Sequence, residues 1–228
     1  MTENNKRVLI LTDSLGCPRK ETEVTKTWTD QVIRANSGKG YFFYTYCKRG
    51  LYANDIYCEY VECLKPDYII VQVGVVDACR RVFTIFQEKV IRRIPIISKL
   101  LFGLSKKYYY YLTKRKSLHY TTPEDFSKIF TRLIENTKAK FCFLAIAPAG
   151  SRMKQIVFHF EEDVLAYNRI LESLAETYPD RVVFIDPYQV VKQDELFLND
   201  GHHLTDVGLD LVFKAVNHYL AIYKGGAI

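Results

Sequence analysis

Three residues near the two ends of the chain have the types that nucleophilic acyl transfer requires. Ser14 follows a continuous apolar run at residues 8–11, and Asp200 and His203 lie close to the other end of the sequence. A serine hydroxyl becomes a nucleophile when an imidazole takes its proton and a carboxylate orients that imidazole. The spacing of Asp200 and His203 lets one short turn hold the carboxylate beside the ring. The sequence therefore predicts a Ser–His–Asp triad, with His202 as a competing base.

The position of Ser14 also favours a role in a binding site. Residues 8–11 read as a strand that is buried on both faces, because all four are apolar. Polar residues at the carboxyl end of such a strand lie where open α/β sheets bind their ligands. The structural alternative is that Ser14 caps the helix that follows, since serine is a favoured N-cap residue.

Together, these two segments resemble the motifs of the SGNH, or GDSL-type, hydrolase family. Residues 12–15 read Thr-Asp-Ser-Leu, with threonine in place of the first glycine of G-D-S-L, and residues 200–203 match the D-x-x-H block. The resemblance extends over about residues 7 to 220. It implies that Ser14 is the nucleophile, His203 the base and Asp200 the residue that orients the base.

The same resemblance implies donors for the oxyanion of the reaction. A glycine after the second strand donates its backbone N–H in this family, and Gly50 is the candidate here, with a simple turn glycine as the alternative. The family's third block reads G-x-N-D, whereas residues 74–77 read Gly-Val-Val-Asp, so Val76 replaces an asparagine whose side chain binds the oxyanion. Losing one such donor costs on the order of 3 kcal/mol. We predict Asp77 and Arg81 as further oxyanion or substrate-binding residues; the alternative is an ion pair between them at a helix start.

A strongly basic segment lies in the middle of the chain. Between Arg80 and Tyr120 there are eleven Lys and Arg residues and one acid, Glu88, so this segment carries +10 while the rest of the chain carries −4. It is longer than an ordinary strand-to-helix connection. We predict a lid or insertion at about residues 82–120. The alternatives are a patch that binds a membrane surface, a partner or an anionic polysaccharide, and a plain solvated face. No nucleic-acid-binding motif accompanies the segment.

Apolar segments with the length of strands alternate with helical patterns along the chain. This alternation predicts one domain with the three-layer α/β/α architecture and a five-stranded parallel sheet, and the resemblance implies a flavodoxin-like strand order. The expected strands are residues 8–11, 41–46, 67–73, 140–146 and 181–185. The expected helices are residues 21–35, 54–64, 121–136, 161–178 and 205–223.

Composition narrows the class of protein. No apolar run approaches the roughly 20 residues that span a membrane, and the first residues, MTENNKR, do not form a signal peptide, so we expect a cytoplasmic protein, with peripheral contact at the inner membrane as an option. The six scattered cysteines are expected to be reduced. No Cys/His spacing matches a zinc site, so we predict neither a metal nor a cofactor. The sequence places three further histidines at the surface: His119, His159 and His218.

The expected activity is hydrolysis of an acyl ester, with an acylated carbohydrate as the substrate. The carbohydrate part comes from a further resemblance: a G-[IV]-V-D block followed by an arginine is similar to SGNH-like proteins of bacterial polysaccharide gene clusters. One alternative is an O-acetyltransferase that uses the same triad and a sugar hydroxyl as acceptor. Another is a non-catalytic ligand-binding protein on the same fold, which the altered G-x-N-D block motivates.

Overall fold

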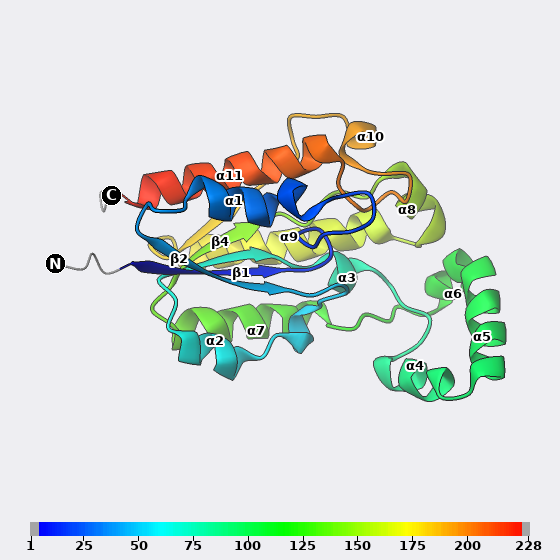
Figure 1. Cartoon of the computed structure of the whole chain (residues 1–228). Helices are drawn as coiled ribbons and strands as arrows, with labels where there is room; N and C mark the ends of the chain where they lie inside the picture. The colour runs from blue at the N-terminus through cyan, green and yellow to red at the C-terminus, as the bar shows by residue number, and fades with distance from the viewer. Residues whose placement is uncertain (1–4, 225–228) are drawn as a thin grey trace.

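The centre of the molecule is a five-stranded sheet in which every neighbouring pair of strands is parallel. The computed structural model describes residues 5–224, of which residues 193, 194 and 224 are described by their backbone alone. The order of the strands across the sheet is β2-β1-β3-β4-β5 (Figure 1), which confirms the predicted flavodoxin-like order. The strands are β1 (Lys6–Thr12), β2 (Tyr41–Cys47), β3 (Tyr68–Gln72), β4 (Lys140–Leu144) and β5 (Val182–Ile185).

Helices cover both faces of this sheet, as the predicted three-layer architecture requires (Figure 1). One face carries α1 (Trp28–Ala35) and α11 (Asp206–Lys224), and the other carries α2 (Cys58–Leu64), α7 (Pro123–Asn136) and α9 (Phe160–Thr177). Shorter helices connect them: α3 (Val75–Ala78), α8 (Ser151–Ile156) and α10 (Gln193–Leu196).

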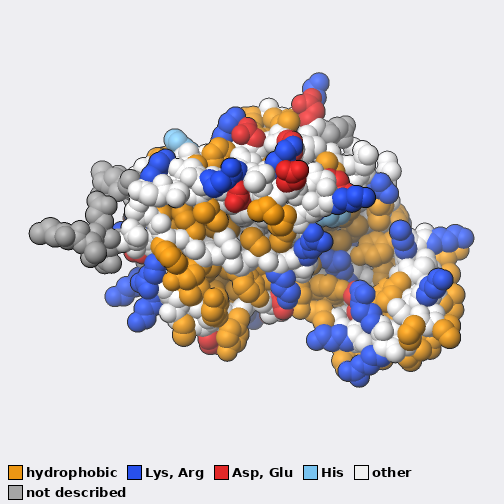
Figure 2. Space-filling view, in the orientation of Figure 1, with side chains coloured by type: hydrophobic (Ala, Val, Ile, Leu, Met, Phe, Trp, Pro, Cys, Tyr) orange, Lys and Arg blue, Asp and Glu red, His pale blue; other side chains and the backbone are white. Residues whose placement is uncertain are grey.

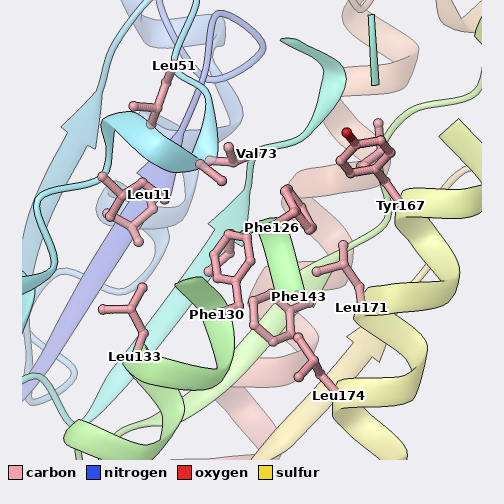
Figure 3. Packing of buried hydrophobic residues seen from close by; sticks show 14 of the residues in the cluster. Leu11, Leu51, Val73, Phe126, Phe130, Leu133, Phe143, Tyr167, Leu171 and Leu174 are labelled. Atoms are coloured by element: carbon pink, nitrogen blue, oxygen red, sulfur yellow. The ribbon is translucent and has the colours of Figure 1, made fainter. Parts of the chain in front are cut away.

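The alternation of side chains along β1 explains why both faces need a helical layer. Val8 and Ile10 are buried in the core cluster beneath α1 and α11, whereas Leu9 and Leu11 are buried in the cluster on the opposite face. Figure 3 shows that second cluster, in which aromatic rings of α7 and β4 fill the space between the sheet and α9. Apolar residues on both faces of a strand are the sign of a buried parallel sheet, and the structure bears out that interpretation.

The first helix begins later than the sequence pattern indicates. Residues 24–26 form only a short 3₁₀ turn, and α1 starts at Trp28, where the Thr27 side chain accepts a hydrogen bond from the Asp30 N–H (3.3 Å). Thr27 is therefore the N-cap of α1. The alternative role for Ser14, as the cap of the following helix, is wrong.

The basic segment forms three helices that stand away from the body of the molecule. We call residues 85–116 the helical arm; it consists of α4 (Ile85–Arg92), α5 (Pro95–Lys107) and α6 (Tyr109–Arg115). The arm lies beyond the carboxyl ends of the strands (Figure 1), and basic and hydrophobic side chains share its surface (Figure 2). Within residues 5–224, no helix has the length and apolar character needed to cross a membrane.

Candidate active site

The structure brings the three predicted triad residues together. The Oγ atom of Ser14 lies 3.2 Å from Nε2 of His203, and Nδ1 of His203 lies 2.6 Å from Oδ2 of Asp200. Ser14 follows the carboxyl end of β1, whereas the other two residues lie in the loop before α11. A chain of contacts from hydroxyl to imidazole to carboxylate is the geometry in which the imidazole can take the proton of the serine.

The adjacent histidine occupies a different place in the site. The rings of His202 and His203 stack with centroids 3.9 Å apart, and Nδ1 of His202 lies 3.5 Å from Oδ1 of Asp200. The contact with Ser14 is made by His203. Of the two candidate bases, the geometry thus favours His203.

The local fold prepares both members of the His–Asp pair for their roles. Although partial burial opposes ionisation, hydrogen bonds from the His203 N–H and side chain and from the His202 N–H hold the pKa of Asp200 at about 2. Burial lowers the pKa of His203 below its usual value, against the opposing effect of Asp200. At neutral pH the site therefore holds an ionised carboxylate next to a neutral imidazole that can accept a proton.

Two glycines allow the loop that carries the His–Asp pair to approach the loop after β4. A Cβ atom on Gly150 would lie only 2.5 Å from the carbonyl oxygen of Gly201, and Gly201 itself has a φ of 80°. The contact is reinforced by Arg152, whose Nη1 donates to the carbonyl of Asn199 (2.8 Å). The segment after β4 thus packs against Asn199 and Gly201, the residues on either side of Asp200. It lies at the carboxyl end of the strand, where parallel sheets have their binding sites.

Asn168 fixes the other end of that supporting loop. Its Oδ1 accepts a hydrogen bond from the Ile146 N–H (2.8 Å), and its Nδ2 donates to the Ile146 carbonyl (3.2 Å). The amide side chain replaces two hydrogen bonds that β4 loses where it leaves the sheet, and paired satisfaction of this kind holds a backbone in place. This role of Asn168 was hard to predict from the sequence, because a single polar residue in an amphipathic helix usually faces the solvent.

A buried polar network holds the strand end from which Ser14 projects. The side chain of Gln72 accepts hydrogen bonds from Thr12 Oγ1 (3.2 Å) and Trp28 Nε1 (2.7 Å) and donates one to the hydroxyl of Tyr188 (3.0 Å). These residues come from β3, β1, α1 and the loop after β5. Trp28 is fully buried and is also a hydrogen-bond donor in this network.

The threonine that replaces the family's first glycine is accommodated by a second glycine. A Cβ atom on Gly16 would lie 2.5 Å from the Thr12 methyl group, so the absence of a side chain at Gly16 makes room for Thr12. This departure from the G-D-S-L pattern is therefore compensated within the same loop.

Asp13, the residue before Ser14, is buried and does not face the solvent. Its side chain is 1% exposed and accepts a hydrogen bond from the Leu15 N–H (2.9 Å), which shapes the turn that carries Ser14. Burial raises the pKa of Asp13 to about 7, an effect that nearby Asp77 increases. Asp13 thus carries its proton in the folded protein at pH values where an exposed aspartate has lost it.

We predict that this buried carboxyl makes the protein less stable as the pH rises from 5 to 8. Up to a pH of about 7, the unfolded chain has released the proton whereas the folded chain still binds it, so the free energy of unfolding falls with pH and levels off above that value. For a pKa of about 7 against 3.8 unfolded, the fall is about 2–3 kcal/mol. Asp13→Asn keeps the acceptor for Leu15 and is expected to remove that part of the slope.

Urea unfolding of the wild type and of Asp13→Asn at several pH values measures this contribution. The comparison stays above pH 5 because Asp200 has the opposite linkage, with stability lost only at lower pH. Equal slopes for the two proteins would show that Asp13 is ionised in the folded state.

Gly50 lies in a turn after the carboxyl end of β2. Because β2 is the parallel neighbour of β1, this turn lies at the same end of the sheet as Ser14. Its φ of 72° belongs to the left-handed region that favours glycine. The preceding residue connects this turn to the nucleophile loop, since Nη2 of Arg49 donates to the carbonyl of Pro18 (2.7 Å). The role of the Gly50 N–H as an oxyanion donor stays a prediction.

Asp77 and Arg81 have different partners and do not pair with each other in the described part of the chain. Oδ1 of Asp77 accepts a hydrogen bond from the Ala53 N–H (2.9 Å). Nη2 of Arg81 donates to the carbonyl of Val76 (3.2 Å), and its guanidinium carbon lies 4.7 Å from the centre of the Tyr120 ring. The alternative of a helix-start ion pair is therefore wrong.

These contacts change what the two residues can do for the site. Asp77 has no exposed surface, and burial raises its pKa to about 6, so the prediction of direct substrate contact by its carboxyl does not fit the structure. Instead it anchors the backbone at Ala53, three residues after Gly50. Arg81 holds the backbone of Val76, the position where the family has its asparagine donor.

His119 is also placed differently from its expected surface position. It is half-buried beside the site's third block, with Nδ1 2.8 Å from the Asp77 carbonyl and Nε2 3.9 Å from Oδ2 of Asp163. Asp163 in turn forms a two-point ion pair with Arg80 (2.6 and 3.1 Å). This cluster could not be predicted from short motifs, because His119 and Asp163 lie far from Asp77 and Arg80 along the chain.

Arg19 is a site residue that sequence reasoning missed. Its Nη2 donates to the carbonyl of Ser14, and its positive charge acts on both Asp200 and His203. Burial lowers the pKa of Arg19. Its position only five residues after the nucleophile was the one available signal.

Among residues 5–224, one cluster has donor atoms close enough for a metal ion. It consists of Asp200, His202 and His203, whose possible ligand atoms all lie within 4.8 Å of one another. Two of these residues, Asp200 and His203, already contact each other through the 2.6 Å hydrogen bond described above. The cluster is therefore accounted for by the His–Asp pair itself.

Comparisons with known proteins reveal similarity of structure rather than of sequence. No protein-family model matches the chain, and no curated protein matches it in sequence. A lipase/acylhydrolase from Enterococcus faecalis has 14% identity and a TM-score of 0.65, with 94% of this chain and 95% of that chain covered. The carbohydrate acetylesterase Est24 from Sinorhizobium meliloti has 16% identity and a TM-score of 0.61, with 96% and 99% covered.

A third structure carries the family's name. It is a protein from Desulfitobacterium hafniense whose name assigns it to the G-D-S-L family, with 13% identity, a TM-score of 0.59, and 94% of this chain and 99% of that chain covered. The three similarities extend over nearly the whole of each chain, so they include the sheet, both helical layers and the loops at the strand ends. The protein therefore has the fold of the SGNH/GDSL acylhydrolases, as its two terminal sequence motifs predicted.

Proposed function

We propose that this protein is a serine-dependent acyl-ester hydrolase that acts on an acylated carbohydrate. The observation that carries the proposal is the continuous contact from Ser14 Oγ through His203 to Asp200. The shared fold with acylhydrolases supports the reaction type. The substrate class is supported by the structural similarity to a carbohydrate acetylesterase.

The residues divide the reaction between them as follows. Ser14 Oγ attacks the ester carbonyl while His203 takes its proton, and Asp200 stabilises the resulting imidazolium. Collapse of the tetrahedral intermediate breaks the ester bond, and His203 returns the proton to the leaving alcohol. Water then attacks the acyl-serine with the help of the same base and releases the acid. The backbone N–H groups of Ser14 and Gly50 bind the oxyanion in both steps.

A serine trap tests the proposal directly. The wild type, incubated with a fluorophosphonate, is expected to gain the mass of one adduct, whereas Ser14→Ala and His203→Ala are expected to gain none. In a second arm, the wild type is expected to release acetate from an O-acetylated oligosaccharide. Absence of an adduct on the folded wild type would contradict an activated serine.

A non-catalytic binding protein is the second candidate function, because Val76 stands where the family has an oxyanion donor. This candidate predicts that the protein binds the acylated sugar without cleaving it and that Ser14→Ala leaves the affinity unchanged. Calorimetry on the wild type and the variant separates the two functions.

The acidic limb of the activity profile is expected to report the titration of His203. The base acts in its neutral form, and burial lowers its pKa below the usual value. Hydrolysis of an aryl acetate is therefore expected to lose half its rate only at a pH below about 6.5, the ordinary pKa of an imidazole. A loss of half the rate already above pH 7 would contradict a lowered pKa for this imidazole.

A further inference from the structure

We propose that the helical arm docks the protein on the surface of an anionic lipid bilayer. The proposal concerns residues 85–116 and is independent of the chemistry at Ser14. It rests on the distribution of apolar and charged side chains over the three helices of the arm.

Helix α5 exposes an apolar stripe that no other part of residues 5–224 covers. The side chains of Ile96 and Leu100 are 84% and 62% exposed, and Ile97 and Leu104 are exposed on the same side. With 3.6 residues per turn, these four positions fall within an arc of about 100°. Exposed contiguous apolar surface on a protein marks a place of contact with a partner or a membrane.

The neighbouring helices of the arm also expose apolar side chains. In α4, Phe86 is 75% exposed, and Val90, one turn later, is also exposed. Tyr108 and Tyr111, at the start of α6 and within it, add exposed aromatic rings. Tyrosine is enriched where proteins meet the interface of a bilayer, because its ring is apolar and its hydroxyl is polar.

The arm also carries nine Lys and Arg residues, of which Lys116 donates to the carbonyl of Val82 (3.2 Å) and Lys114 lies over the Phe158 ring, and its one acid already has partners. Glu88 accepts a hydrogen bond from the hydroxyl of Tyr120 and pairs with Arg92 (3.3 Å). Among the described ion pairs, that with Arg92 is the one that involves a cation of the arm. The arm's other cations are Lys89, Arg93, Lys99, Lys106, Lys107, Lys114, Arg115 and Lys116.

Apolar and basic surface together favour a lipid over the other occupants of such a surface. A soluble anionic polysaccharide or a nucleic acid would use the cations but leave Ile96, Leu100 and Phe86 in water. A second copy of this chain would bring two arms of the same charge together, which costs energy. A bilayer with anionic headgroups satisfies both parts of the surface, and the arm would lie in its interface without crossing it.

Hydrogen bonds and ring contacts attach the arm to the body of the molecule. Thr113, fully buried, accepts a hydrogen bond from the Phe158 N–H (3.3 Å), and the Tyr110 and Phe158 rings meet edge to face at 5.6 Å. On the same helix, the hydroxyl of Tyr109 donates to the Arg80 carbonyl (2.8 Å). The arm's buried side chains, Thr113 and Ser105, therefore lie on α6 and near the end of α5, whereas α4 and α5 carry most of the exposed apolar side chains.

Co-sedimentation with lipid vesicles tests the proposal. The wild type is expected to bind vesicles in which phosphatidylglycerol replaces a third of the phosphatidylcholine, to bind pure phosphatidylcholine weakly, and to lose affinity as salt is added. The triple change Lys99→Gln, Lys106→Gln and Lys107→Gln is expected to lower the affinity for the anionic vesicles roughly 100-fold. The double change Ile96→Ser and Leu100→Ser is expected to lower it at least ~10-fold.

Matched changes on the body serve as controls. Leu165→Ser with Ile222→Ser removes two exposed apolar side chains outside the arm, and Lys39→Gln with Lys65→Gln and Lys138→Gln removes three exposed lysines. Both controls are expected to bind vesicles like the wild type. Every variant is expected to keep its activity on a soluble aryl acetate, so that loss of docking and loss of the proposed hydrolysis are seen separately.

Four results would overturn the proposal. The first is equal binding of the wild type to anionic and neutral vesicles, and the second is unchanged binding by both arm variants. The third is a wild-type dimer that the Ile96→Ser, Leu100→Ser variant abolishes while no protein sediments with vesicles, since the arm would then bind a second copy. Binding to dextran sulfate without binding to vesicles would likewise assign the cations to a polysaccharide.

Discussion

Ser14→Ala and His203→Ala are each expected to lower kcat/KM for an ester substrate by about 10⁴-fold or more. The two side chains act as one unit, because the hydroxyl is nucleophilic only while the imidazole takes its proton at 3.2 Å. The double variant is therefore expected to be no worse than either single variant. Asp200→Asn is expected to cost a similar factor, since an amide can no longer stabilise the imidazolium.

Initial rates of acetate release from an aryl acetate, measured over a range of substrate concentrations, check this prediction. Ser173→Ala and His218→Ala are matched controls on exposed helical positions and are expected to keep full activity. Substantial residual activity in Ser14→Ala, with additive effects in the double variant, would show that the serine is not the nucleophile.

Val76→Asn is expected to raise kcat by about 10-fold or more, because it restores the side-chain donor that the third block of the family supplies. One donor in an oxyanion hole is worth about 10²–10³ in rate when its geometry is ideal. The backbone of Val76 is already held by Arg81, and it belongs to α3, which follows the strand next to β1. The new amide would thus need only its side chain to reach the oxyanion.

Val76→Asp provides the matched control for this gain. Aspartate has the shape of asparagine but carries a negative charge near neutral pH, so it is expected to lower kcat instead of raising it. Equal rates for the asparagine, aspartate and wild-type proteins, all equally stable to heat, would mean that the oxyanion does not form near residue 76.

Much of the architecture could be predicted because buried parallel strands have an unmistakable pattern. Four consecutive apolar residues before Ser14 fixed the position of β1, and similar runs marked the other strands. The boundaries were less certain where local patterns compete: residues 21–27 have helical spacing, yet the chain makes only a short turn there, and Thr27 caps the helix instead. Capping chemistry decides such boundaries more sharply than periodicity does.

The site was predictable only where its chemistry is written in short motifs. Ser14, Asp200 and His203 could be proposed from residue type and spacing, and the structure brings them within contact distance. The residues that support this triad could not be predicted, because their partners lie far away in the sequence. Asn168, for example, is hydrogen-bonded to the backbone of Ile146, 22 positions earlier. Asp77 is the opposite case. Its charge and its position in a site motif predict a contact with the substrate, whereas its side chain is fully buried.

The base of the arm has a consequence for how such a protein can change over generations. The backbone N–H of Arg81 donates to the carbonyl of Leu118 (2.7 Å), so the chain leaves the body and returns to it at nearly the same point. An excursion closed in this way can be shortened, lengthened or exchanged without disturbing the order of the sheet strands. The arm can therefore change in length and surface over generations while the strand ends next to Ser14 keep their places in the sheet.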